Sequence, residues 1–271
     1  MSEVVVIKFG GGLITEKSQH CTANISVIED LVDVVSRCLE SGLQVIVVHG
    51  AGSFGHLRAK RWRLSEGHVD NYTFSTQTDC ETQKQAVSIV RKEMLTLNKI
   101  VCEVFAKQGI STKSLPPHQW AKNTGSSFDG EITENFTAEE DVIITFGDVV
   151  DCDEKEFGIL SGDDIVVRIC EDIANVSRLV FAIKGVDGIL MKPPEEATDD
   201  DLITEWSPSI SFRGVHNTEI DVTGGIALKA KRGAEVASLG VDVFIVNGEK
   251  PERIFDACMG IPTKGTRIYS E

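Results

Sequence analysis

The sequence predicts an α/β fold, an open αβα sandwich around a mainly parallel central sheet. Runs of β-branched apolar residues, such as Val4–Phe9 and Leu43–Val48, end abruptly in glycine, as buried parallel strands do. Between these runs lie segments with the apolar spacing of amphipathic helices. Strand and helix alternate without a long linker, which indicates one compact domain over residues 1–271. Within it we expect an N-terminal lobe over about 1–170 and a C-terminal lobe over about 171–271.

The predicted elements can be placed in order along the chain. The first strand, Val4–Phe9, precedes a helix near 26–41 that ends at Gly42, where glycine favours a helix C-terminus. A long amphipathic helix is expected over about 79–108, before Gly109. The remaining expected elements are a polar loop or small hairpin at 123–135, strands at 142–146 and 179–183, a turn at 184–188, a solvated acidic loop at 192–201, and late strands at 241–246 and 265–268.

The amino-acid composition limits the kinds of ligand and surface that this protein can bind. With 27 Lys and Arg against 42 Asp and Glu, the formal net charge is −15 and the pI is near 4.9. That balance argues against a nucleic-acid or anionic-membrane surface, so an anionic substrate would have to be attracted by a local cluster of Lys and His. Seven scattered cysteines without a CxxC pair predict reduced thiols. We see no signal peptide and no apolar run of membrane-spanning length, so a cytoplasmic protein is expected.

Two strand-to-glycine turns carry the first functional signal. They are the segments VVVIKFGGG (4–12) and VIVVHGAGSFGH (45–56). Glycines just past a strand let backbone N–H groups approach an anion closely. One turn carries Lys8 and the other carries His56, so the pattern indicates phosphoryl transfer between two bound phosphate compounds.

A dinucleotide-binding fold is the competing interpretation, because GAGSFG (50–55) has glycine spacing close to that fingerprint. Against it, this turn follows the second strand and is flanked by His49 and His56. No acidic residue ends a strand about twenty residues further on, where a ribose partner is expected.

Two later segments complete the predicted chemistry. In GILSGDDIVVRIC (158–170), Asp163 or Asp164 is expected to cap the following helix, while Asp163 could instead enter the site and orient lysines. In DVTGGIALK (221–229), Gly224 and Gly225 open a helix that carries Lys229 in its first turns.

In this order, the four segments resemble the amino acid kinase superfamily, and within it the isopentenyl phosphate kinases. The resemblance rests on IKFGGGLITEK (7–17), VHGAGSFGH (48–56), FGDVV (146–150), ILSGDDI (159–165), VDGI (186–189), DVTGGIALK (221–229) and GTRI (265–268). His56 is the discriminating residue, since this family uses it to hold the acceptor phosphate. The resemblance implies ATP-dependent phosphorylation of isopentenyl phosphate in mevalonate-type isoprenoid biosynthesis, and the amino acid kinase fold.

The resemblance also implies roles for individual residues. Catalysis would involve Lys8, His56, Asp163 and Lys229. The nucleotide would be bound by Lys8, Gly10, Gly11, Gly12, Lys17, Gly52, Val186, Asp187, Gly188, Gly224, Gly225 and Lys229, and the acceptor phosphate by Ala51, Gly55, His56 and Gly162. The resemblance further implies ATP with Mg²⁺ held mainly by the nucleotide rather than by protein ligands, and a homodimer.

Two departures from the family pattern concern the nucleotide side. The first turn reads GGG where the family usually has GGS, so a hydroxyl is missing at Gly12. The strand after Leu179 reads FAIKGVDG, where the family has a shorter acidic turn, so Lys184 and Gly185 resemble an insertion. We expect Lys184 either to contact ATP or to end a strand in solvent.

Other functions remain open at this stage. One alternative is a kinase of another small phosphate or phosphonate, similar to the fosfomycin kinases, and another is a non-catalytic nucleotide sensor. An apolar acceptor pocket would favour the isoprenoid, and Phe74, Val90 and Met94 are the expected wall.

Overall fold

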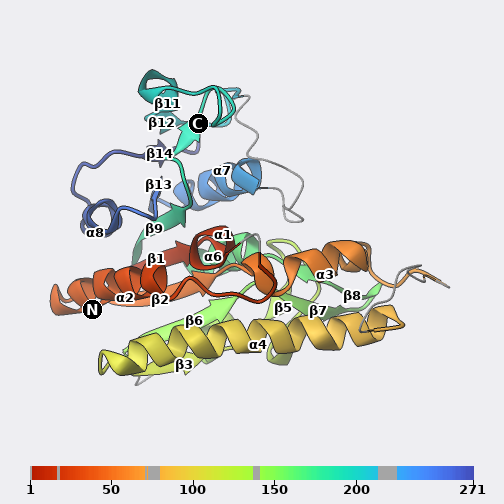
Figure 1. Ribbon diagram of the computed structural model, residues 1–271. Coiled ribbons are helices and arrows are strands. Elements are labelled where there is room, and N and C mark those ends of the chain that lie inside the picture. The colour runs from red at the N-terminus through yellow and green to blue at the C-terminus, as the bar shows by residue number, and fades with distance from the viewer. Residues whose placement is uncertain (1, 17–18, 71, 73–79, 137–140, 213–224) are drawn as a thin grey trace.

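The computed structural model describes residues 2–16, 19–70, 72, 80–136, 141–212 and 225–271 (Figure 1). Within these residues, eight strands form the central sheet in the spatial order β12-β14-β13-β9-β1-β2-β6-β3. In this order they are β12 (Glu205–Trp206), β14 (Thr266–Ile268), β13 (Asp242–Asn247), β9 (Val176–Ile183), β1 (Val4–Phe9), β2 (Gln44–His49), β6 (Val142–Phe146) and β3 (Thr112–Ser114). The six strands from β13 to β3 are parallel, and β14 is antiparallel to β13. The predicted α/β fold with a mainly parallel sheet is confirmed.

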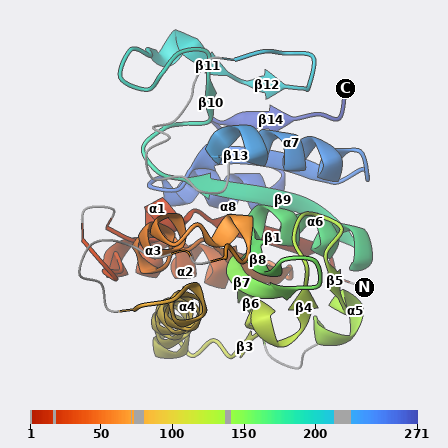
Figure 2. The ribbon, with the colours of Figure 1, turned by 90° about the vertical axis from the view of Figure 1, so that its right-hand side faces the viewer.

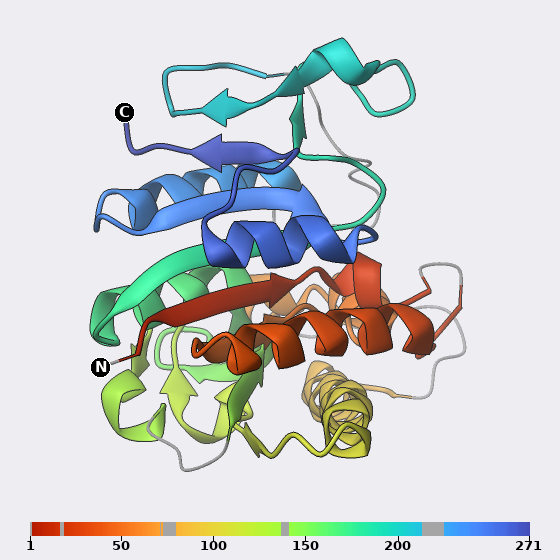
Figure 3. The same cartoon turned by 90° about the vertical axis from the view of Figure 1, so that its left-hand side faces the viewer.

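Helices cover both faces of this sheet. On one face lie α2 (Ile25–Glu40), α4 (Gln83–Lys107) and α8 (Pro251–Met259), of which α2 and α8 face the viewer in Figure 3. On the other lie α6 (Gly162–Asp172) and α7 (Gly225–Ala237), which face the viewer in Figure 2. Alternate residues of β1 enter the two cores, Val5 on the first side and Val6 on the second. Burial on both faces explains why β1 is apolar almost throughout.

Helix ends follow local capping rules. Helix α2 begins after Asn24, whose side chain accepts a hydrogen bond from Val27 N, and Gly42 beyond its end has a φ of +86°. The long helix α4 begins later than expected, because Thr82 forms a capping box with Gln85. Gly109, with a φ of +76°, follows its end.

Several short elements were not expected from the sequence. A second sheet has the order β5-β4-β7-β8, with bounds Asp129–Gly130, Ala121–Lys122, Asp148–Cys152 and Glu156–Leu160. Strand β5 lies within 123–135 and pairs antiparallel with β4 just before that region, which confirms the small hairpin expected there as one alternative. The short helix α5 (Ile132–Asn135) in the same region was not expected. The remaining short helices are α1 (Gly11–Ile14), α3 (His56–Arg61), η1 (Gly52–Phe54), η2 (Leu64–Glu66), η3 (Pro117–Gln119) and η4 (Asp199–Asp201).

The acidic segment 192–201 is bracketed by the hairpin β10 (Ile189–Leu190) and β11 (Leu202–Ile203). Most of it is exposed or half-buried, but Asp201 is buried and accepts hydrogen bonds from Thr198 and Lys192. The prediction of a purely solvated loop is therefore wrong at Asp201.

Among the described helices, none combines the length and apolar character needed to span a membrane. All seven cysteines are free thiols, as expected.

Candidate active site at the sheet edge

Strand register brings the two glycine turns together. In the pairing of β1 with β2, Phe9 lies opposite His49, so Gly10 and Gly50 leave the sheet side by side. The backbones then touch: a Cβ on Gly11 would lie 2.4 Å from Gly52 N. A side chain at Gly11 is therefore impossible without moving the other turn. The carboxyl edge of parallel strands is where α/β proteins commonly bind ligands.

The Thr15 hydroxyl links the two glycine turns by hydrogen bonds. Its hydroxyl donates to Gly11 O at 2.8 Å and accepts from Ser53 N at 3.0 Å. Gly52 has a φ of +53°, and a Cβ there would lie 2.0 Å from Thr15 Oγ1. The role of Thr15 was not predicted, because it depends on contacts across the two turns rather than on spacing along one of them.

A buried carboxylate joins two lysines at this edge. Asp163, at the start of α6, accepts from Lys8 Nζ at 3.2 Å through Oδ1 and from Lys229 Nζ at 3.0 Å through Oδ2. Lys8 comes from the end of β1, and Lys229 from the second turn of α7. Side chains of Lys8 and Asp163 are almost fully buried, whereas that of Lys229 is 15% exposed.

The charge state of Asp163 follows from its neighbours. Burial by itself would raise the pKa of this carboxyl, but the positive charges of Lys229 and Lys8 outweigh burial and hold the pKa below its usual value. Asp163 is therefore ionised at neutral pH. Two lysines against one carboxylate leave a net positive charge, which suits an anionic ligand.

The expected capping role of the two aspartates is wrong. Ser161 is the N-cap of α6, and its hydroxyl accepts from Asp163 N at 3.1 Å. Asp164 instead pairs with Arg232 of α7, at 2.8 Å from Nε. Burial raises the pKa of Asp164 despite Arg232. The adjacent carboxylates thus both connect α6 to α7, but only Asp163 lines the cavity described next.

Most of the predicted site residues line a single cavity. Those that line it are Lys8, Gly10, Gly11, Gly12, Ala51, Gly52, Gly55, His56, Gly162, Asp163, Lys184, Gly225 and Lys229. Lys184 is half-buried. Predicted residues Lys17 and Gly224 lie outside the described part of the chain.

The predicted residues Val186, Asp187 and Gly188 are not among the residues lining this cavity. Asp187 forms an ion pair with Arg253 and another with Lys264 at 2.8 Å. Burial opposes ionisation of Asp187, but these partners and Asn247 lower its pKa to about 2. The Asp187 side chain therefore holds the turn to the C-terminal part of the chain.

Apolar side chains contributed by several elements also line the cavity. Among them are Leu57, Ala59, Val90, Met94, Val149 and Ile159. Helix α4 packs closely against the second glycine turn, since a Cβ on Gly55 would lie 3.2 Å from Val90 Cγ1. Val90 and Met94 thus lie where expected, whereas Phe74 is outside the described residues.

Asp148 also lines the cavity, although no role was predicted for it. Its carboxylate is buried, with Oδ2 2.6 Å from His118 Nδ1 and Oδ1 accepting from Val149 N at 2.8 Å. Both oxygens are thus occupied by the protein. The Gly147–Asp148 step after a buried strand was the available signal, since it repeats the strand-to-glycine pattern of the other two turns.

The two histidines flanking the second turn differ in character. His49 is fully buried, lies 3.2 Å from Asn98 Oδ1 through Nε2 and stacks on Phe146. Burial lowers the pKa of His49 to about 4, so the ring is neutral. His56 begins α3, is half-buried and lines the cavity. Only His56 is placed to meet a ligand.

Comparison with known proteins agrees with this geometry. Residues 3–247 match the model of the amino acid kinase family. An isopentenyl phosphate kinase from Thermoplasma acidophilum is 32% identical over 93% of this chain and 95% of its own. One from Methanothermobacter thermautotrophicus is 28% identical over 98% of both chains. A crystal structure of the T. acidophilum enzyme in a product complex superposes with a TM-score of 0.76, at 28% identity, over 98% of this chain and 99% of that one.

The chain therefore belongs to the amino acid kinase family, and within that family it groups with the isopentenyl phosphate kinases. Members of such a family are phosphotransferases, which fits a cavity that combines lysines with two glycine turns.

Proposed function

We propose that this protein transfers the γ-phosphoryl group of ATP to isopentenyl phosphate, giving isopentenyl diphosphate and ADP. The observation that carries the proposal is the Lys8–Asp163–Lys229 cluster, which opens into the same cavity as His56 and the two glycine turns. A phosphate oxygen of the acceptor attacks the γ-phosphorus. The bond from that phosphorus to the bridging oxygen of ADP breaks.

The acceptor's chemistry explains the residues on its side. A phosphate monoester is largely ionised at neutral pH, because its second pKa is about 6, so its oxygen needs no general base. The barrier is electrostatic: two like charges about 4 Å apart repel by about 4 kcal/mol at an effective dielectric near 20. Lys8, Lys229 and backbone N–H groups would offset that repulsion as charge develops on the transferring group.

Two sets of residues would divide the binding. The nucleotide phosphates would lie against Lys8, Lys17, Lys184, Lys229 and the glycines at 10–12, 52, 224 and 225, with the backbone of 186–188 close to the nucleoside. The acceptor phosphate would lie against Ala51, Gly55, His56 and Gly162. Gly162 leaves room for Lys8, since a Cβ there would lie 2.6 Å from Lys8 Cε.

The apolar wall favours an isoprenoid acceptor over a polar one. Val90, Met94 and Ile159 offer a five-carbon chain a surface on which its burial is favourable by about 25 cal/mol per Å² of apolar area. A small polar phosphate or phosphonate would leave that surface without a partner.

Magnesium would be held mainly by the nucleotide. Among the described cavity residues, Asp148 and Asp163 are the carboxylates. Asp148 already pairs with His118, and Asp163 already pairs with Lys8 and Lys229. Mg²⁺ would supply neutralising charge on the phosphate oxygens. We further propose a cytoplasmic homodimer whose N-terminal lobe, to about 170, carries the acceptor site and whose C-terminal lobe completes the nucleotide site.

An ATP-consumption assay across a panel of acceptors tests the proposal. The panel contains isopentenyl phosphate, a small polar phosphate monoester, a small phosphonate and no acceptor. We expect ADP release with isopentenyl phosphate at a kcat/KM at least tenfold above the other acceptors, with a diphosphate product. Preference for the phosphonate would assign the phosphonate-kinase alternative. ATP binding without turnover on any acceptor would indicate a sensor.

A further inference from the structure

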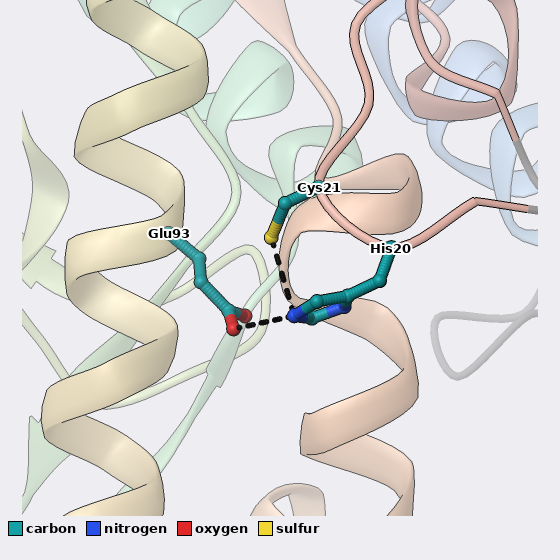
Figure 4. A group of neighbouring side chains, drawn as sticks. All are labelled: His20, Cys21 and Glu93. Atoms are coloured by element: carbon teal, nitrogen blue, oxygen red, sulfur yellow. Dashed lines mark hydrogen bonds and ion pairs between the residues drawn. The ribbon is translucent and has the colours of Figure 1, made fainter.

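A cluster outside the cavity brings together three side chains of metal-binding type. His20 and Cys21 lie on the segment between α1 and α2, and Glu93 lies on α4 (Figure 4). His20 Nε2 is 3.5 Å from Cys21 Sγ and 3.3 Å from Glu93 Oε1. All three ligand atoms lie within 4.8 Å of one another. We propose that His20, Cys21 and Glu93 form a binding site for a zinc ion.

The ligand atoms lie close enough together for a tetrahedral zinc site. With Zn–S of about 2.3 Å and Zn–N or Zn–O of about 2.0–2.2 Å, neighbouring ligand atoms lie about 3.3–3.6 Å apart. The distance from His20 Nε2 to Cys21 Sγ, 3.5 Å, falls in this range. The Glu93 carboxylate lies beside the same ring nitrogen, with Oε1 at 3.3 Å. Three protein ligands leave a fourth position for water. A thiolate with an imidazole selects zinc over magnesium or calcium, which prefer oxygen ligands.

An unsatisfied oxygen points to the same conclusion independently. The side chain of Glu93 is nine-tenths buried, and its Oε2 accepts no hydrogen bond from any residue that the structure describes. A buried carboxylate oxygen without a partner is costly, so a cation or a donor is expected there. Arg58 of α3 already occupies Oε1, at 2.9 Å from Nη2 and 3.1 Å from Nε. Zinc can therefore take Oε2 while the Arg58 pair persists.

The site is anchored to the second glycine turn. Cys21 N donates to Ser53 O at 3.2 Å, and Thr22 N donates to Ser53 Oγ at 3.3 Å. Met94, the residue after Glu93, lines the cavity. A bound zinc would connect the segment at 20–21 to α4 beside this turn, and the expected consequence is stabilisation of the folded state by mass action.

The Cys21 thiol must lose its proton to bind the ion. Burial and the nearby Glu93 carboxylate raise the pKa of Cys21 to about 11, so the thiol is protonated at neutral pH. A bound cation reverses this balance, as it does for thiolate ligands in general. Binding of zinc would release this proton.

Titration of the metal-free full-length protein with zinc sulfate, in competition with a chromophoric chelator, tests the site. The wild type should bind one ion per chain with a rise in melting temperature, and Co²⁺ in its place should show thiolate-to-cobalt charge-transfer absorption. Loss of groups that merely support a metal ligand costs about 10–100-fold in affinity, so Cys21→Ser should weaken zinc binding by at least about a hundredfold.

Two further variants keep the result interpretable. His20→Ala should also weaken binding, and it should fold normally because the His20 side chain is 56% exposed. Cys102→Ser, at a half-buried thiol elsewhere on α4, should bind zinc like the wild type. Zinc affinity within twofold of wild type in Cys21→Ser would overturn the proposal. So would a wild type that takes up no zinc at millimolar concentration.

Discussion

The second glycine turn and the turn after β9 lie at the same edge of the sheet but are held in different ways. Gly50 and Gly52 are fixed by backbone contacts with Gly11, where any Cβ would clash. The turn at 184–188 is held by charged side chains, since Asp187 pairs with Arg253 and Lys264. Steric contacts between backbones leave no alternative geometry, whereas partly exposed ion pairs contribute little individually. The second glycine turn should therefore be rigid and intolerant of change, and the turn at 184–188 more adjustable.

His56→Ala should have the largest effect on activity. It removes a cavity side chain from the rigid turn, where no other described histidine can replace it. Losing a charge-assisted hydrogen bond to phosphate costs about 1.5–3 kcal/mol in binding alone, and more if the bond tightens in the transition state. We expect loss of more than about 99% of kcat/KM, with ATP affinity nearly unchanged by calorimetry.

The matched control is His68→Ala, at an exposed histidine on the segment after η2. It should turn over isopentenyl phosphate at the wild-type rate. If His56→Ala itself turned over isopentenyl phosphate near the wild-type rate, the second glycine turn would not bind the acceptor. The contrast between the two turns would then have no bearing on catalysis.

Lys229→Ala should have the next largest effect, mainly on kcat. The lysine pairs with Asp163 at the cavity and would meet charge that accumulates on the transferring phosphoryl group. Removing one such group costs about 10²–10³ in kcat. Steady-state kinetics with both substrates varied would show a fall in kcat larger than any rise in KM.

The neighbouring pair supplies the control. Arg232→Ala breaks the contact with Asp164, one residue from Asp163 but outside the cavity. It should lower the melting temperature while kcat stays close to wild type. Equal losses of kcat in the two variants would mean that the lysine acts only by joining α6 to α7.

Sequence patterns predicted the features that are set by local rules. Strands β1 and β2 and the C-terminal glycine of α2 came from apolar runs and glycines. The meeting of Lys8, Asp163 and Lys229, which lie far apart along the chain, came only from the family resemblance. The hairpin of β7 and β8 was missed, because its short mixed strands lack the long apolar run of the central sheet. Ser161 rather than an aspartate caps α6, since several adjacent residues were chemically able to do so. The ion pairs of Asp187 with Arg253 and Lys264 were not predicted, because these partners lie more than sixty residues away along the chain and local spacing cannot reveal them. The placement of Asp187 near the nucleotide came from the resemblance and stays a prediction.

Asp187→Asn should lower stability moderately, in a way that depends on pH. The folded-state pKa of Asp187 is about 2, below its unfolded value, so its ionisation stabilises the fold above the unfolded pKa. This contribution is about 1 kcal/mol for partly exposed partners. Denaturant titrations should show a constant difference between wild type and variant above about pH 5, which shrinks as pH falls from about 4 to 2. A pH-independent difference would contradict the ion-pair role, and a several-fold rise in the KM for ATP would place the carboxylate on the nucleotide.

Lys184→Ala should have the smallest effect, and it tests how adjustable the turn at 184–188 is. Lys184 follows the last residue of β9, is half-buried and lines the cavity, and Gly185 after it has a φ of +79°. One charge-assisted contact to a phosphate or ribose oxygen would compensate for the hydroxyl missing at Gly12. We expect the KM for ATP to rise roughly three- to tenfold, with kcat and the acceptor KM unchanged.

Lys192→Ala, at an exposed lysine 3.0 Å from Asp201, is the control and should leave both KM values at wild type. If Lys184→Ala also leaves the KM for ATP unchanged, the residues 184–185 are only a variant of the loop, and the nucleotide must rely on Lys8, Lys229 and the glycine turns.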